Sequence, residues 1–161
     1  MSTESLESLA MSTTEPQPRT GVRIGPGAFV GVTEEMIHQL VHGFYARIRV
    51  DPALGPIFNR VIHDWDPHLQ KMCDFWSSVM LLSGRFRGAP MPAHIRIPDI
   101  RPTHFARWLH LFRQSAQELC PPEAAALFIA RAEMIAESLQ FGIAASRGEL
   151  PPLRPPARAE P

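Results

Sequence analysis

Apolar residues recur along the middle of this chain with the spacing of α-helices. From about residue 33 to about residue 147 they return every three or four positions, in four separate stretches. None of these stretches shows a strand-like alternation longer than a few residues. The pattern therefore predicts an all-α fold built on four main helices.

The first predicted helix begins at Thr33 and runs to about Val50. Thr33 is a suitable N-cap, and the acidic residues Glu34 and Glu35 follow in the first turn, where the helix dipole is positive. The face expected to be buried consists of Ile37, Leu40, Val41, Phe44 and Ile48. Tyr45 falls at the edge of this face, so we expect its ring to be buried and its hydroxyl to point into a cavity.

The second helix is expected to open at Asp66-Pro67 and to end near Ser83-Gly84. It has two neighbouring apolar stripes. One contains His68, Met72, Phe75, Val79 and Leu82, and the other contains Leu69, Cys73, Trp76 and Met80. A helix that is apolar over more than half of its surface contacts two bodies, so we predict protein on one side and a bulky ligand on the other.

Two connections contain prolines. Residues 51–58 are predicted to form a short tight turn that places Leu54, Ile57 and Phe58 on the core. Residues 88–98 are predicted to form a proline-rich loop. Prolines restrict the backbone of this loop, so it would hold the imidazole of His94 on a stiff segment that suits a metal ligand.

The last two helices are expected at about 102–120 and 123–147. The third carries Phe105, Trp108 and Phe112 on one face, and the fourth serves as a scaffold. Together the helices predict one domain over residues 32–147. Residues 1–31 and 148–161, rich in proline and small or polar residues, are expected to be a disordered leader and a disordered tail.

Charge and cysteine content exclude several classes of function. Sixteen basic and sixteen acidic residues cancel, which predicts neither a nucleic-acid partner nor an anionic membrane partner. The two cysteines form no Cys-x-x-Cys motif, so a disulfide framework, a cysteine-based zinc site and covalent c-type haem attachment are not expected. No apolar run reaches signal-peptide or membrane-spanning length, so we expect a cytoplasmic protein.

Several of these features occur together with a characteristic spacing. They are Phe44-Tyr45, then after six residues Pro52-x-Leu54-Gly55-Pro56-Ile57-Phe58-Asn59, then Phe75-Trp76, then His94 eighteen residues on, and finally Phe105-x-x-Trp108. Taken jointly, this arrangement resembles the group III truncated haemoglobins over residues 33 to about 145. The resemblance implies a two-over-two helical sandwich in a bacterial protein that binds haem b.

The resemblance also assigns roles to individual residues. His94 would be the proximal ligand of the haem iron, held on the proline-rich loop. Tyr45, His68 and Trp108 would line the distal side, where hydrogen-bond donors stabilise the partial negative charge of a dioxygen ligand. Residues expected to pack on the porphyrin or line its cavity are Phe58, Met72, Phe75, Val79, Ile97, Phe105 and Phe112. Candidate partners for the haem propionates are Arg85, Arg87, Arg96 and Arg101.

Three functions remain open at this point. The leading hypothesis is a haem b protein that reversibly binds dioxygen, nitric oxide or carbon monoxide, coupled or not to redox chemistry on nitric oxide or peroxide. The second is an enzyme, peroxidase-like or nitric-oxide-dioxygenating, that relies on an external reductase because no Gly-x-Gly-x-x-Gly fingerprint is present. The third is a cofactor-free helical interaction module whose aromatic stripe is ordinary core.

Overall fold

The structure, a computed structural model, describes residues 23–149, and this part of the chain consists of helices and their connections. The elements are the 3-10 helix η1 (Pro26–Val30) and the α-helices α1 (Glu34–Val50), α2 (Gly55–Val61), α3 (Trp65–Leu81), α4 (Pro90–Ile95), α5 (Pro102–Leu119) and α6 (Pro122–Ser146). The all-α class is confirmed. None of the helices in residues 23–149 has the length and apolarity needed to cross a membrane.

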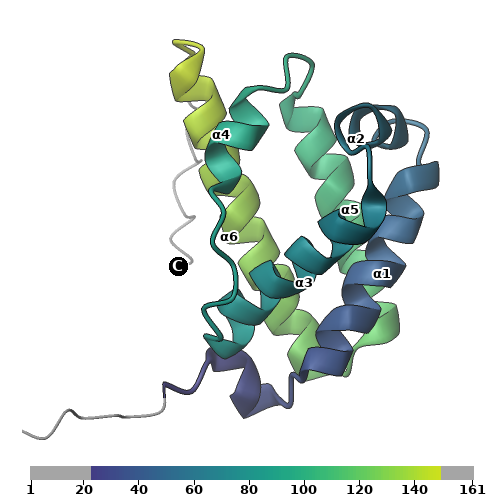
Figure 1. Cartoon of the computed structure of the whole chain (residues 1–161), viewed down its shortest axis with the longest axis vertical. Coiled ribbons are helices and arrows are strands. Elements are labelled where there is room, and N and C mark those ends of the chain that lie inside the picture. The colour runs from purple at the N-terminus through teal and green to yellow at the C-terminus, as the bar shows by residue number, and fades with distance from the viewer. Residues whose placement is uncertain (1–22, 150–161) are drawn as a thin grey trace, which may run out of the picture.

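The four long helices form two layers. α1 packs on α3, α5 packs on α6, and α1 also packs on α5 and so joins the layers. In Figure 1, α3 passes in front of α5 and α6, while α4 lies beside the upper part of α6. Phe44, Phe112 and Phe128 are fully buried between the layers. Burial of such a side chain stabilises the fold by roughly 1.5–3 kcal/mol, so this aromatic core fixes how the long helices cross.

The caps of α1 and α3 show how local sequence sets the helix starts. The Thr33 hydroxyl accepts a hydrogen bond from the backbone N–H of Met36 at 3.2 Å, as expected of an N-cap. In α3 the cap is Asp64, whose carboxylate accepts from the N–H of Asp66 at 3.3 Å. The predicted opening at Asp66-Pro67 is therefore slightly too late in the chain, and Trp65 is the first residue of α3.

The segment after α1 is a turn only over residues 52–54, because α2 begins at Gly55, so the predicted tight turn is wrong for residues 55–58. The buried Asp51 carboxylate accepts hydrogen bonds from the N–H groups of Ala53 at 3.1 Å and Leu54 at 3.0 Å, which initiates α2. Gly55 allows the chain to turn close to α1, because a Cβ at this position would lie 2.8 Å from the carbonyl oxygen of Arg49. As predicted, Leu54 and Ile57 are buried, whereas Phe58 is half-buried.

The proline-rich segment that carries His94 is also helical in part. Pro90 and Pro92 occupy the first and third positions of α4. The first N–H groups of a helix have no partner within it, so proline is tolerated there although it would break a helix interior. The prediction of a loop is therefore wrong for residues 90–95. α4 packs on α6 and buries none of its own residues.

The first helical element lies before residue 32, the predicted start of the domain. Residues 26–30, which the sequence assigns to the leader, form η1, and η1 packs on α3 and α6. Gly25 and Gly27 are buried in this contact. The remainder of the predicted leader, residues 1–22, and residues 150–161 of the predicted tail lie outside the described residues.

Candidate functional site

The two apolar stripes of α3 differ in burial. Leu69, Cys73, Trp76 and Met80 are buried against the rest of the protein. His68, Met72, Phe75 and Val79 are half-buried, and we call them the open stripe. Leu82, predicted to extend this stripe, instead follows the last turn of α3 with φ 55° and lies exposed. One side of α3 therefore packs on the core, as predicted, while the other keeps apolar surface for a further contact.

An aromatic group surrounds His68 at the start of the open stripe. Its ring lies 5.5 Å from that of Tyr45 and 5.7 Å from that of Trp65, edge to face in both cases. Tyr45 is buried, and its ring also contacts Phe58. Trp65 is a site residue that the sequence analysis missed. The spacing of three between Trp65 and His68 would have indicated it, had the helix been started at Trp65 rather than after Asp66.

The Nε2 atom of His68 is buried and has no hydrogen-bond partner in residues 23–149. Burial lowers the pKa of this imidazole, and the charges of Lys71 and His94 lower the pKa further. His68 is therefore neutral at pH 7, with one ring nitrogen available to donate and the other to accept. A buried polar atom without a partner is rare in folded proteins and calls for an explanation such as a ligand.

Two other predicted polar groups, the Tyr45 hydroxyl and the Trp108 indole N–H, lie on either side of Phe44 in its chain of ring contacts. Burial raises the pKa of Tyr45 far above its usual range, so its hydroxyl remains protonated and can donate. Trp108 is half-buried and, like Tyr45, packs edge to face on Phe44. Within the described part of the chain neither the Tyr45 hydroxyl nor the Trp108 indole N–H forms a hydrogen bond, whereas the indole of Trp65 donates to Asn59.

His94 presents its other ring nitrogen for binding. Its Nδ1 lies 2.6 Å from the carbonyl oxygen of Pro90. A carbonyl only accepts, so the proton is on Nδ1 and the lone pair is on Nε2. The charge of His94 is also one of the causes that lower the pKa of His68, after burial and Lys71. The two histidines of α5 are less suited to bind a ligand. Nδ1 of His104 accepts a hydrogen bond from the N–H of Arg101, and His110 is exposed.

Not every predicted site residue lies with the open stripe. Ile97 and Phe105 belong to a second apolar cluster, around the C-terminal half of α6, which Leu109 and Ile135 connect to the main core. Phe112 is fully buried and stacks between Trp76 at 5.1 Å and Trp108 at 5.4 Å. Protein covers both faces of this ring, and the contact of Phe112 with a cofactor stays a prediction. Phe112 stacks on the ring of Trp108 and so holds it in place.

The four arginines predicted as partners of the propionates differ in whether they already form ion pairs. Arg85 forms ion pairs with Glu34 at 2.8 Å and with Asp74 at 3.2 Å, so its guanidinium is already neutralised. It is no longer a candidate for pairing with an anionic group of a ligand. Arg87, Arg96 and Arg101 are exposed and form no ion pair within residues 23–149.

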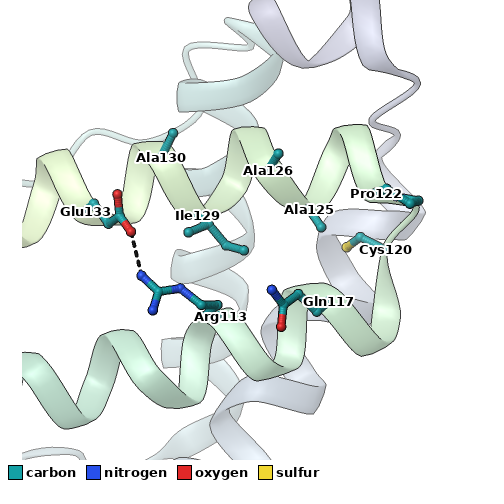
Figure 2. Close-up of a pocket in the computed structure, with 9 residues that line it drawn as sticks. All are labelled: Arg113, Gln117, Cys120, Pro122, Ala125, Ala126, Ile129, Ala130 and Glu133. Atoms are coloured by element: carbon teal, nitrogen blue, oxygen red, sulfur yellow. Dashed lines mark hydrogen bonds and ion pairs between the residues drawn. The ribbon is translucent and has the colours of Figure 1, made fainter. Parts of the chain in front are cut away.

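A groove between α5 and α6 offers no comparable chemistry. Figure 2 shows it lined by Arg113, Gln117, Cys120, Pro122, Ala125, Ala126, Ile129, Ala130 and Glu133. Its two charged residues, Arg113 and Glu133, pair with each other at 2.7 Å. Burial raises the pKa of the Cys120 thiol, which keeps it protonated and unreactive. In residues 23–149 no three His, Cys, Asp or Glu side chains converge to hold a metal ion by themselves.

Comparison with known proteins gives one consistent result. No protein-family model matches the chain. A group 3 truncated haemoglobin of Campylobacter jejuni is 34% identical over 116 residues, which cover 70% of this chain and 91% of that protein. The crystal structure of a group III truncated haemoglobin from Campylobacter jejuni matches with a TM-score of 0.65 and 33% identity, over 67% of this chain and 88% of that structure. The predicted resemblance is confirmed, and the chain belongs to the group III truncated haemoglobins.

Proposed function

We propose that this protein binds haem b through His94 and takes up dioxygen, nitric oxide or carbon monoxide on the side lined by Tyr45, His68 and Trp108. The observation that carries the proposal is the buried, unpartnered Nε2 of His68 at the start of the open stripe of α3. A cofactor-free interaction module gives no reason for a buried polar atom to lack a partner.

The residues present fit a haem group. Haem has two apolar faces, a charged edge and an iron that prefers a neutral imidazole. The open stripe of α3 offers the apolar surface, and His94 offers an imidazole whose lone pair is on Nε2. Proposed apolar contacts are Phe58, Met72, Phe75, Val79, Ile97 and Phe105. Arg87, Arg96 and Arg101 are the proposed partners of the propionates.

The chain's own residues would control how a gas is held. Haem supplies the iron at which a diatomic gas binds. The bond from His94 Nδ1–H to the Pro90 carbonyl orients the imidazole and raises the basicity of Nε2. On the proposed gas side, the hydroxyl of the buried residue Tyr45 remains a donor at physiological pH and His68 remains neutral. Donors in such a low-dielectric setting stabilise a ligand that carries partial negative charge and slow its release.

A second candidate is an enzyme that oxidises nitric oxide or reduces peroxide with electrons from an external reductase. The observation in its favour is the number of polar groups without partners on one side of the site, namely Tyr45, His68 and Trp108. Several hydrogen-bond donors would slow the release of the gas. Slow release suits an enzyme that reacts with its bound gas more than a carrier that must release it. Steady-state turnover of nitric oxide or peroxide with an external electron donor distinguishes the two functions, because the enzyme should consume its substrate faster than free haem does and a carrier should not.

The first experiment is an absorption spectrum of the purified protein before and after addition of haem. We expect a Soret band and, after reduction, spectral changes on exposure to dioxygen or carbon monoxide. Extraction with acidified solvent tests the type of haem, because haem b leaves the protein whereas a covalently attached haem remains. Absence of a Soret band at saturating haem would exclude both the gas-binding protein and the enzyme.

A further inference from the structure

The helix that carries His94 has little to hold it in place. α4 has six residues, and none of them is buried. A helix of this length is not stable by itself, because nucleation fixes several residues for very few hydrogen bonds. The position of the imidazole must therefore come from contacts that α4 and the segment after it make with the rest of the fold. These contacts come mainly from α6.

The first such contact is a tight fit at the start of α4. Met91 lies against Gly142 of α6, where a Cβ would meet the methionine sulfur. The absence of a side chain at position 142 lets α4 lie close to α6. This contact fixes the beginning of α4, three residues before His94, but leaves its end free.

The second contact fixes the segment that follows His94. Arg147, the C-cap residue of α6, donates from Nη1 to the carbonyl of Ile100 at 3.0 Å. Its Nη2 donates to the carbonyls of Ile97 at 3.3 Å and Pro98 at 3.4 Å. The N–H of Ile97 in turn donates to the carbonyl of His94 at 3.1 Å. One guanidinium therefore hydrogen-bonds to three carbonyls in the connection between α4 and α5, which begins two residues after His94.

We propose that Arg147 is a positioning residue for His94, which sets the distance and tilt of the imidazole relative to the haem iron. This role rests on the proposed function of His94. A guanidinium is suited to it because its planar array of donors reaches several acceptors at once and stays charged at every relevant pH. Its charge also lies at the C-terminal end of α6, where the helix dipole favours a cation. The guanidinium of Arg147 hydrogen-bonds to the backbone of residues 97–100, so it would act on His94 through that backbone.

The test compares three variants of the full chain. Arg147→Met keeps the length of the side chain and removes the donors, whereas Arg147→Lys keeps the charge with a single ammonium group. Arg113→Met is the matched control, because it removes one positive charge and an α5–α6 ion pair away from α4. The readouts are the iron–histidine stretching band of the ferrous, gas-free protein, the rate of haem transfer to excess apomyoglobin, and amide hydrogen exchange of the protein as purified.

We expect the stretching band of Arg147→Met to shift and broaden, and haem transfer to be about tenfold faster. Amides in residues 93–100 should exchange faster, while those in α1 and α3 should not change. Arg147→Lys should fall between this variant and the wild type, so the test holds even if Arg147→Met folds poorly. Arg113→Met should match the wild type.

A wild-type stretching band in both Arg147 variants would overturn the positioning role. A shift of the same size in Arg113→Met would also overturn it, because the effect would then follow from lost charge. If the wild type itself gives no Soret band, the proposed function fails. Faster exchange at residues 93–100 in Arg147→Met would then show that Arg147 stabilises this backbone without any role toward haem. Unchanged exchange would exclude that stabilisation as well.

Discussion

The two histidines proposed to face each other across the haem are held in very different ways. His68 stands on α3, a helix of 17 residues with a side-chain cap and five buried residues. His94 stands on α4, which has six residues and none buried. The core therefore determines the position of His68, and changes there should affect folding. A few contacts from α6 determine the position of His94, so changes there should affect the cofactor and leave the fold largely intact.

The largest effect is expected from removal of the imidazole on α4. His94→Ala should accelerate haem loss at least about a hundredfold, because the iron loses its only protein ligand on that side. Haem transfer to apomyoglobin measures this rate, and circular dichroism should show unchanged helix content because α4 buries nothing. His104→Ala and His110→Ala are the controls. If all three variants lose haem equally, His94 is not the ligand.

Two methionines of α3 separate its packed stripe from its open stripe. Met80 is 0% exposed, so Met80→Ala should lower the free energy of unfolding by about 2–5 kcal/mol. Met72 is half-buried on the open stripe, and Met72→Ala should lower the free energy of unfolding of the haem-free protein by roughly 1 kcal/mol. Urea titration measures both values. Equal losses would mean that the open stripe packs on protein as tightly as the other.

The distal donors should affect gas release without affecting haem retention. Tyr45→Phe removes one hydroxyl from a buried ring, so dioxygen should dissociate about tenfold faster, the equivalent of one hydrogen bond. Trp108→Phe should act in the same direction. Flash photolysis and stopped-flow displacement give the rates, and the haem transfer rate serves as the internal control. Unchanged dissociation in both variants would place the stabilising donors elsewhere.

The smallest effect concerns pH and the neutral state of His68. Burial, Lys71 and His94 lower the pKa of this imidazole in the folded protein, whereas in the unfolded chain it titrates near about 6.5. The unfolded state therefore binds more protons below this pH, and the contribution of His68 to stability is lost as the pH falls from about 6.5 toward the folded pKa. His68→Gln should flatten the stability of the haem-free protein in this range. If His68→Gln leaves the slope of unfolding free energy against pH unchanged, another group causes the pH dependence.

Much of the fold was predictable because helix signals are local. The start of α1 at Thr33 and the two stripes of α3 follow from a cap and from the spacing of apolar residues. The short helices were not predictable in this way. α2 depends on Asp51, which accepts two backbone bonds and also pairs with Arg107, 56 residues further along the chain. α4 depends on α6, so its prolines alone indicated a loop.

By itself, the sequence determined which residues could form the site. The joint spacing of its motifs carried the resemblance, and the resemblance named four candidates, His94, Tyr45, His68 and Trp108. Residue type and spacing can be read from the sequence without knowing how the helices pack. Only the tertiary structure decided how they work. It showed which stripe of α3 remains open, which nitrogen of His94 is free, that the ring of Trp65 lies beside that of His68, and that Arg147 bonds to the backbone after His94. Each of these facts depends on groups brought together by packing or by exact backbone geometry, and periodicity along one chain contains no information about such distances.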